Sequence, residues 1–240
     1  FLDDSFDREI LKKIKNYDYI LVSIPPKNGI DIVIKNFQET LEILKSNWIT
    51  YLSATSVYGD HNGEWVDENS KVNPLTENGK SRLNAEKIWI NIAKKKNLPI
   101  QIFRLSGIYS QERNILEKIK SGSHQIINKP NHFFSRIHVE DISNVLKITL
   151  DSKYIKPGEI YNLSDDYPCS NIEVANYAYD LMKVSKPKMI ETNEIENEML
   201  RNFYKDSKKV SNKKMKTFFN YDLKFPSYIE GLKHIRDNQA

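Results

Sequence analysis

The chain has 240 residues, of which 39% are hydrophobic and 28% are charged; this composition is typical of a globular protein with a buried core. It carries 36 Lys and Arg against 32 Asp and Glu, a net charge of +4. The basic residues are scattered and form no stripe, which argues against nucleic acid as the main partner. The single cysteine, Cys169, excludes an intramolecular disulfide and a cysteine-based zinc site, and it fits a protein of the reducing cytoplasm.

Short apolar runs alternate with helical patterns over the first 105 residues, and this alternation is typical of a parallel sheet covered by helices. A first helix is expected near residues 5–15. The next five elements alternate along the chain: a strand at 18–24, a helix at 30–44, a strand at 48–53, a helix at 82–96 and a strand at 99–105. The pattern therefore predicts an α/β domain.

After about residue 110 the alternation becomes looser. The expected elements are a helix at 114–120, strand-like segments at 125–127 and 133–139, a helix at 141–151, a strand at 159–163 and a helix at 171–182. The last of these has the strongest start signal, because Ser170 followed by Glu173 forms a capping box. We expect residues 1–110 to form a core domain and residues 111–240 a smaller α+β lobe interleaved with it.

Several kinds of site and segment are excluded by spacing. The longest apolar runs, such as residues 19–22, are far shorter than the roughly 20 residues that a bilayer requires. The five histidines lack the HxH and HxxxH spacings of a metal site. The chain has eight glycines, where average usage predicts roughly seventeen, and no two of them form the GxGxxG loop that binds dinucleotide phosphates.

Six stretches nevertheless share their order and spacing with one group of enzymes. They are residues 53–59, 74–86, 103–109, 137–141, 158–162 and 207–212. Together they resemble the extended short-chain dehydrogenase/reductase superfamily, in its NAD-dependent epimerase/dehydratase group, and most of all its atypical YeeZ-like branch. The resemblance covers nearly the whole chain. It implies a Rossmann-type doubly wound parallel sheet that binds NAD or NADP and a C-terminal lobe that binds a small-molecule substrate.

In that family the first strand and its Gly-rich turn come roughly fifty residues before the point at which this chain begins. The favoured interpretation is that the chain is a fragment or an incompletely ordered form of a longer protein. The alternative is a protein without the phosphate cradle. The residue that selects NAD over NADP follows the second strand of the family, so the sequence does not choose between them.

The resemblance also places the catalytic positions. The family uses a tyrosine as general acid/base, a lysine four residues later that favours the phenolate, and a serine or threonine that polarises the substrate carbonyl. These positions hold Asn78, Arg82 and Ala54, and an asparagine amide cannot exchange protons near neutral pH. The usual mechanism is therefore not expected, and the neighbouring Thr55 and Tyr58 become the candidate catalytic residues.

The remaining candidates follow from the same resemblance. Those expected to contact the cofactor are Ser23, Ile24, Pro25, Ser53, Arg82, Leu105, Gly107 and Ile108. Those expected to contact the substrate are Tyr58, Arg113, Asn114 and Arg136. For Arg136, and for Arg104 on the predicted strand, two roles stay open, since an arginine can hold a ligand anion or form a buried salt bridge. His138 is expected to fix the junction with the lobe through a backbone hydrogen bond.

Two classes of function remain. The first is an epimerase/dehydratase-like enzyme that acts on an unknown substrate, with a sugar-related one suggested by the resemblance alone. The alternative is a non-catalytic dinucleotide-sensing or scaffold protein. Relatives often dimerise through two helices, one of which corresponds to residues 82–96, so a homodimer is also expected.

Overall fold

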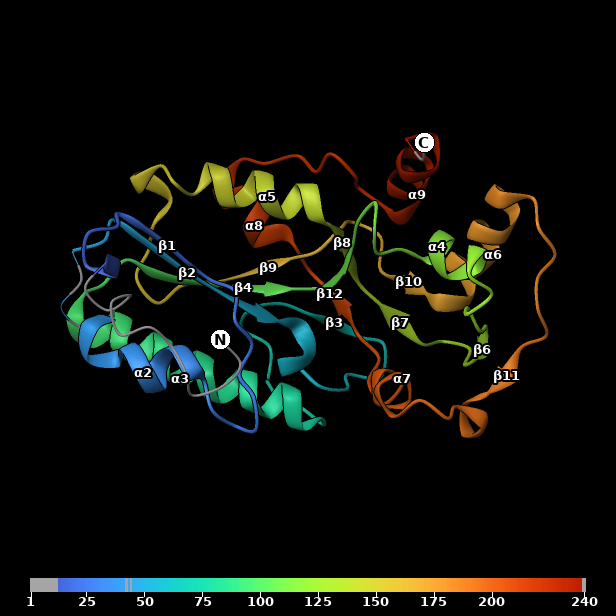
Figure 1. The fold of residues 1–240 in the computed structure, drawn as a ribbon, viewed down its shortest axis with the longest axis horizontal. Helices are drawn as coiled ribbons and strands as arrows, with labels where there is room; N and C mark the ends of the chain where they lie inside the picture. The colour runs from blue at the N-terminus through green and yellow to red at the C-terminus, as the bar shows by residue number, and fades with distance from the viewer. Residues whose placement is uncertain (1–12, 42, 44, 239–240) are drawn as a thin grey trace.

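The centre of the molecule is a four-stranded parallel sheet with strand order β1-β2-β4-β9 (Figure 1). The computed structural model describes residues 13–41, 43 and 45–238. The sheet strands are β1 (Tyr19–Val22), β2 (Trp48–Ala54), β4 (Ile100–Leu105) and β9 (Ile160–Leu163). The expected Rossmann-like α/β fold is confirmed, and three of these strands fall where the alternating pattern of the first 105 residues predicted them.

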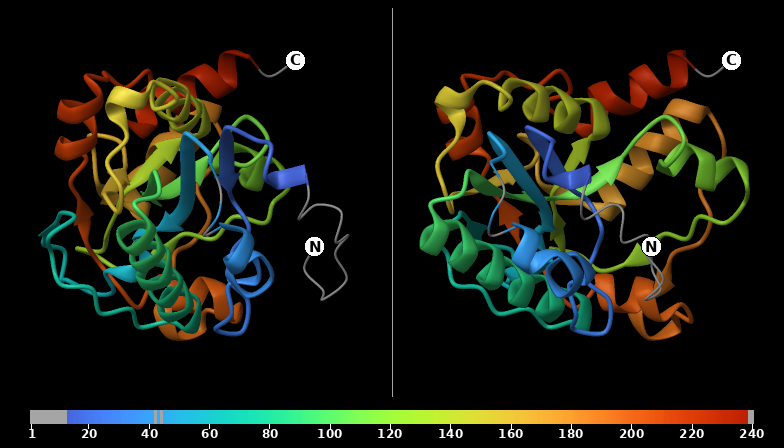
Figure 2. Two further views of the ribbon diagram at one scale, coloured as in Figure 1. Left: turned by 90° about the vertical axis from the view of Figure 1, so that its left-hand side faces the viewer. Right: turned by 60° about the vertical axis from the view of Figure 1, so that its left-hand side comes forward.

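Two pairs of helices cover the two faces of this sheet (Figures 1 and 2). One face packs against α2 (Ile32–Leu41) and α3 (Glu77–Lys96), and the other against α5 (Val139–Ile148) and α8 (Lys213–Phe219). Strand β4 shows why both faces are apolar, because Ile100 and Ile102 join the first core and Phe103 and Leu105 join the second. This continuous burial is expected of a parallel strand with helices on both sides.

Helix α3 begins five residues before the start that its apolar pattern predicted. Thr76 caps it, since the Thr76 hydroxyl accepts a hydrogen bond from the Gly79 N–H at 3.1 Å. The first turn is polar and therefore gave no periodic signal. At its other end Asn97 adopts a left-handed conformation with φ of 49°, which terminates the helix.

Strand β1 lies at the edge of the sheet. Its side chains alternate, with Ile20 and Val22 buried and Tyr19 and Leu21 exposed to 53% and 46%. Within the described residues the outer edge of β1 pairs with no other strand. The helix predicted near residues 5–15 falls mostly outside the part of the chain that the structure describes.

Outside the central sheet, the short strands of the described residues pair as two-stranded ribbons. The pairs are β5 (Gly107–Tyr109) with β8 (Arg136–His138), β6 (Ile127–Asn128) with β11 (Ile190–Glu191), β7 (Phe133–Phe134) with β10 (Cys169–Ser170), and β3 (Trp65–Val66) with β12 (Lys209–Val210). Further helices are α4 (Ile115–Lys120), α6 (Asn171–Met182), α7 (Glu198–Phe203) and α9 (Tyr228–Asp237). Three short 3₁₀ turns complete the chain, namely η1 (Thr55–Val57), η2 (Ser152–Tyr154) and η3 (Thr192–Glu194).

The capping box at Ser170 correctly predicted where a helix begins. Helix α6 runs over the predicted residues, and the Ser170 hydroxyl accepts from the Glu173 N–H at 3.1 Å. The predicted strand at 133–139 instead divides into β7 and β8, and α5 begins at Val139, directly after its cap, His138. In the described part of the chain no helix is both long enough and apolar enough to cross a membrane.

Candidate functional site

The loops that follow β1, β2 and β4 gather at one edge of the sheet, because parallel strands all end on the same side. After β1 come Ser23 and Pro25, both exposed, and after β2 the 3₁₀ turn begins at Thr55. After β4 come Gly107 and Ile108, of which Ile108 is 40% exposed. Open α/β sheets bind their ligands at this edge.

A buried ion pair underlies that edge. The Arg104 guanidinium on β4 donates to the Glu86 carboxylate of α3, with an Nη2–Oε2 distance of 2.7 Å, and both side chains are at most 4% exposed. The Ser53 hydroxyl donates to Glu86 Oε1 at 2.5 Å. Of the two roles left open for Arg104, the structure therefore shows the salt bridge. The hydroxyl of Ser53, expected to contact the cofactor, is instead directed into this pair.

Tyr58 lies deeper in the molecule than a proton carrier should. Its side chain is fully buried and its hydroxyl donates to Asn162 Oδ1 on β9 at 2.8 Å. The Arg104 guanidinium covers the ring at 4.8 Å from its centroid. Burial raises the pKa of Tyr58 to about 12, although the nearby Arg104 favours the phenolate. This geometry does not support the predicted roles of Tyr58 in catalysis and substrate binding. Tyr58 instead links the turn that follows β2 to strand β9.

The two other positions from the resemblance lie on α3. Asn78 is exposed in the first turn of the helix. Arg82, one turn later, is half-buried and its Nη1 donates to the Leu52 carbonyl at 2.7 Å. Thr55 is largely buried, and its side chain forms no hydrogen bond with another described residue. Arg82 thus ties α3 to β2 close to Thr55.

The end of β4 is shaped by a close approach of two segments. The Leu105 side chain packs in the core, so it offers no surface to a ligand. A Cβ atom on Gly107 would lie 2.3 Å from the Phe134 ring, which explains why glycine occupies this position. Between Leu105 and Gly107, Ser106 has a buried hydroxyl without a hydrogen-bond partner among the described residues.

The substrate-binding candidates outside the sheet have different environments. Asn114 is buried and caps α4, since its side chain accepts from the Glu117 N–H at 3.1 Å and donates to the Ser110 and Gln111 carbonyls. Its amide is fully used, which explains the helix start and argues against the predicted contact with substrate. Arg113, by contrast, is exposed.

Arg136 lies at the junction between the sheet and the lobe. Its guanidinium donates to the Phe134 carbonyl at 3.1 Å, to Cys169 Sγ at 3.4 Å and to Asn171 Oδ1. It forms no salt bridge with a described carboxylate, although Asp165 lies close enough for the two charges to interact. Its role as an anion-binding residue stays a prediction.

Asp165 is a feature that sequence reasoning missed. The residue lies two positions after the end of β9 and is only 1% exposed. Neither carboxylate oxygen has a hydrogen-bond partner in the described structure. Burial raises the pKa of Asp165 to about 8, while Arg136 and the backbone N–H groups of Tyr167 and Arg136 act in the opposite direction. The only sequence signal is an acidic pair after a strand, which is ordinary in a loop.

His138 makes a backbone hydrogen bond as predicted, but within its own segment, where it caps a helix; its expected role at a junction with the lobe stays a prediction. Its Nδ1 accepts a hydrogen bond from the Glu140 N–H at 3.3 Å and so caps α5. The imidazole ring packs against Tyr109 and Phe225. Burial lowers the pKa of His138, which is consistent with a neutral capping side chain. Among residues that the structure describes, no group of three His, Cys, Asp or Glu side chains is arranged to hold a metal ion.

Comparison with known proteins adds to this picture. No family model matches the chain, and no curated protein matches it by sequence. A solved structure described as a functionally unknown conserved protein from Silicibacter pomeroyi is 35% identical, with a TM-score of 0.84 over 92% of this chain and 77% of that one. The chain belongs to that protein's family.

The fold of the family is shared with characterised enzymes. UDP-glucuronic acid 4-epimerase from Bacillus cereus, solved in complex with NAD, has a TM-score of 0.77 and 18% identity over 99% of this chain and 80% of its own. The dTDP-glucose 4,6-dehydratase from Bacillus anthracis, also solved with NAD, has a TM-score of 0.76 and 16% identity over 96% and 76%. At these identities the likeness establishes the epimerase/dehydratase fold.

Proposed function

We propose that the protein is an NAD(P)-binding member of the extended short-chain dehydrogenase/reductase superfamily, of an atypical branch that lacks the usual tyrosine and lysine. The observation that carries this proposal is the likeness in fold, over nearly the whole chain, to epimerases and dehydratases solved with NAD. The substrate in this proposal is a small molecule, and a sugar-related one rests on that likeness alone.

The residues at the sheet edge fit one half of such a cofactor. Ser23, Ile24 and Pro25 after β1, Thr55 after β2, and Ile108 after β4 offer polar groups and accessible surface at the edge where nicotinamide would lie. When bound, the nicotinamide would supply a hydride acceptor or donor. Arg82 would hold the cofactor's ribose.

The described residues do not fit the other half, the phosphates. A dinucleotide pyrophosphate binds the free N–H groups at a helix start. At the start of α2, the Asp31 carboxylate already accepts from the Val33 and Ile34 N–H groups. At the start of α3, Thr76 fills the equivalent position. The proposal therefore assigns no phosphate contact to these helices.

Any turnover at this edge of the sheet would lack a side chain that transfers the proton. In the proposal Thr55 donates a hydrogen bond to a substrate carbonyl, but Asn78 and Ala54 supply no acid or base. Loss of general acid/base catalysis lowers rates by roughly 10²–10⁴. The buried hydroxyl of Tyr58 favours the second candidate function, a non-catalytic dinucleotide-sensing or scaffold protein.

Cofactor binding is tested by titrating the purified protein with NADH and with NADPH. Energy transfer from the three tryptophans, Trp48, Trp65 and Trp89, to the reduced nicotinamide would report binding. We expect saturation, and we expect Arg82→Gln to weaken binding while Lys87→Gln, an exposed change on the same helix, leaves it unchanged. Absence of saturation with both nucleotides would refute the proposal.

Turnover is tested separately on the protein that binds. The protein is incubated with the oxidised nucleotide and a panel of sugars, nucleotide sugars and hydroxy acids, and the absorbance of reduced nicotinamide is followed. Reduction that Thr55→Val abolishes supports the enzyme. Saturable binding with neither reduction nor a new product, the latter followed by chromatography of each substrate, supports the sensing function instead.

Two further expectations belong to this proposal, a cytoplasmic location and a homodimer through α3. Ile88 on that helix is 38% exposed, as an interface residue would be in the free chain. Sedimentation equilibrium of the wild type and of Ile88→Glu tests the dimer, which the substitution should dissociate.

A further inference from the structure

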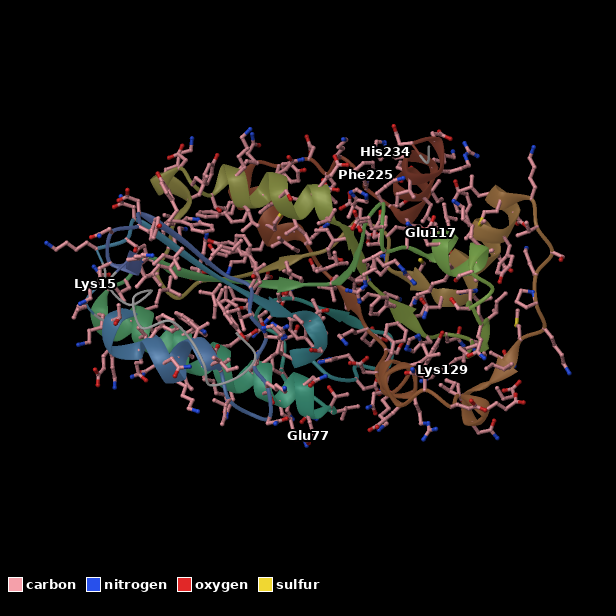
Figure 3. All side chains as sticks on the ribbon, in the orientation of Figure 1. Lys15, Glu77, Glu117, Lys129, Phe225 and His234 are labelled. Carbon is pink, nitrogen blue, oxygen red and sulfur yellow. The ribbon has the colours of Figure 1, made fainter. Side chains whose placement is uncertain are left out.

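A pocket of about 280 Å³ lies in the C-terminal lobe between η3, α7 and the segment that follows β6. Figure 3 shows Lys129 beside α7, on the side of the molecule where β6 and β11 meet. The residues that line the pocket are Lys129, Thr192, Asn193, Ile195, Arg201, Tyr204 and Lys205. Three separate segments of the chain therefore converge on it, and three of its side chains are cationic.

The cations are held in place by neutral groups. Lys129 Nζ donates to the Tyr204 carbonyl, and the Arg201 Nε and Nη2 atoms donate to the Ile195 carbonyl at 3.1 and 2.7 Å. Lys205 is exposed, and its ammonium has no hydrogen-bond or ion-pair partner within the described ranges. These contacts hold Lys129 and Arg201 in place without neutralising them, and together with Lys205 they leave three positive charges at one pocket.

The neighbouring carboxylates are engaged elsewhere. Glu191 accepts from the Asn128 amide at 2.7 Å, and Glu194 accepts from the Glu191 N–H at 2.6 Å. Asp206 pairs with Lys208 at 2.7 Å. None of the pocket-lining residues in the described structure is acidic. An anion in the pocket would therefore meet three lining cations and no lining carboxylate, while Glu191 and Glu194 keep their charge outside the lining.

The shape of the pocket indicates a phosphate on an organic molecule. A phosphate group carries about −1.5 to −2 charges at neutral pH and three acceptor oxygens, which suits several cations, whereas a carboxylate is satisfied by one arginine. Thr192 and Asn193 add a hydroxyl and an amide. The buried side chains of Ile195 and Tyr204 add an apolar wall, which a bare inorganic ion would not use.

We propose that this pocket binds a small organic molecule through its phosphate group, with Lys129, Arg201 and Lys205 as the anion-binding residues. The site is independent of the proposed cofactor site, since it shares no residue with the sheet edge. It does communicate with the lobe junction. The Tyr204 hydroxyl accepts from Asn171 Nδ2 at 3.0 Å, and Asn171 Oδ1 accepts from Arg136, so a ligand that moves Tyr204 would also move the Arg136 contacts.

Titration calorimetry with three probes tests the proposal, namely inorganic phosphate, phenyl phosphate and acetate. We expect one site per chain for both phosphates, tighter binding of phenyl phosphate, and no saturation with acetate. Lys205→Gln and Arg201→Gln should each weaken phosphate binding by about tenfold or more, the loss expected for a hydrogen bond to a charged group. Lys188→Gln, an exposed lysine in the same lobe, and Arg82→Gln should have no effect.

Each alternative result overturns a defined part of the proposal. Absence of saturation with either phosphate, or equal weakening by Lys188→Gln, overturns the site. Acetate binding as tight as phosphate overturns the phosphate assignment, and phenyl phosphate no tighter than phosphate overturns the organic ligand. Weakening by Arg82→Gln would place the phosphate at the sheet edge. If Arg201→Gln fails to fold, Lys205→Gln decides, because its side chain supports no described contact.

Discussion

Two arginines of this molecule have opposite surroundings. Arg104 is buried under the sheet edge and paired with the carboxylate of Glu86. Arg201 lies at a pocket in the lobe, where its hydrogen bonds go to backbone carbonyls. A buried charge must be paired because its desolvation is costly, whereas a charge at a pocket can keep its capacity for a ligand. Charge pairing thus separates residues that hold the fold from residues that can bind.

The strongest test of this comparison is to remove the carboxylate of Glu86, the acid of the buried pair. Glu86→Gln keeps an acceptor for Ser53 but leaves the Arg104 cation buried and unpaired. We expect a loss of about 3–5 kcal/mol in the free energy of unfolding, as for other broken buried pairs, measured by urea denaturation. Glu77→Gln breaks an exposed pair with Lys80 and is the control, with an expected change of less than about 1 kcal/mol. Equal effects of the two changes would contradict the comparison.

Asp165 is a buried carboxylate that lacks the pairing of Glu86. Its pKa is raised from 3.8 to about 8, so between these values the folded protein binds a proton that the unfolded chain has lost. Stability should therefore fall as pH rises through this window. We expect Asp165→Asn to gain stability relative to the wild type by more than about 1 kcal/mol between pH 5 and pH 8. Urea midpoints at several pH values check this, and parallel curves for the two proteins would refute it.

How much of this was accessible from the sequence differs between the two regions. The strands of the sheet and helix α6 were predicted because apolar periodicity and the Ser170 cap are local signals. The predicted cofactor contacts of Ser53 and Leu105 ignored burial, which depends on what other segments place against them. The basic pocket brings together Lys129 and Arg201, residues 72 positions apart in a lysine-rich sequence, and no spacing rule connects such residues.

Tyr58 lies in the first of the two regions, since its ring packs on Arg104 and its hydroxyl donates to Asn162 on β9, the strand beside β4. Tyr58→Phe retains the ring and removes the hydroxyl, which leaves the Asn162 amide oxygen buried without this donor. We expect a loss of about 1–2 kcal/mol in stability. Urea denaturation measures it, and NADH affinity should be unchanged because the side chain is buried. A large loss of cofactor binding at full stability would restore Tyr58 to the site.

The smallest effect is expected at the pocket. Lys205→Gln removes an exposed charge that has no described partner, so the stability of the free protein should change by less than about 0.5 kcal/mol. The difference should emerge only with ligand, because a ligand that binds the folded state stabilises it by an amount that grows with the logarithm of its concentration relative to Kd. At a given phosphate concentration, the unfolding midpoint should thus rise less for Lys205→Gln than for the wild type and for Lys188→Gln. Removing a charge that stabilises the fold lowers the free energy of unfolding at any ligand concentration. Removing a charge that binds the ligand lowers it only when the ligand is present.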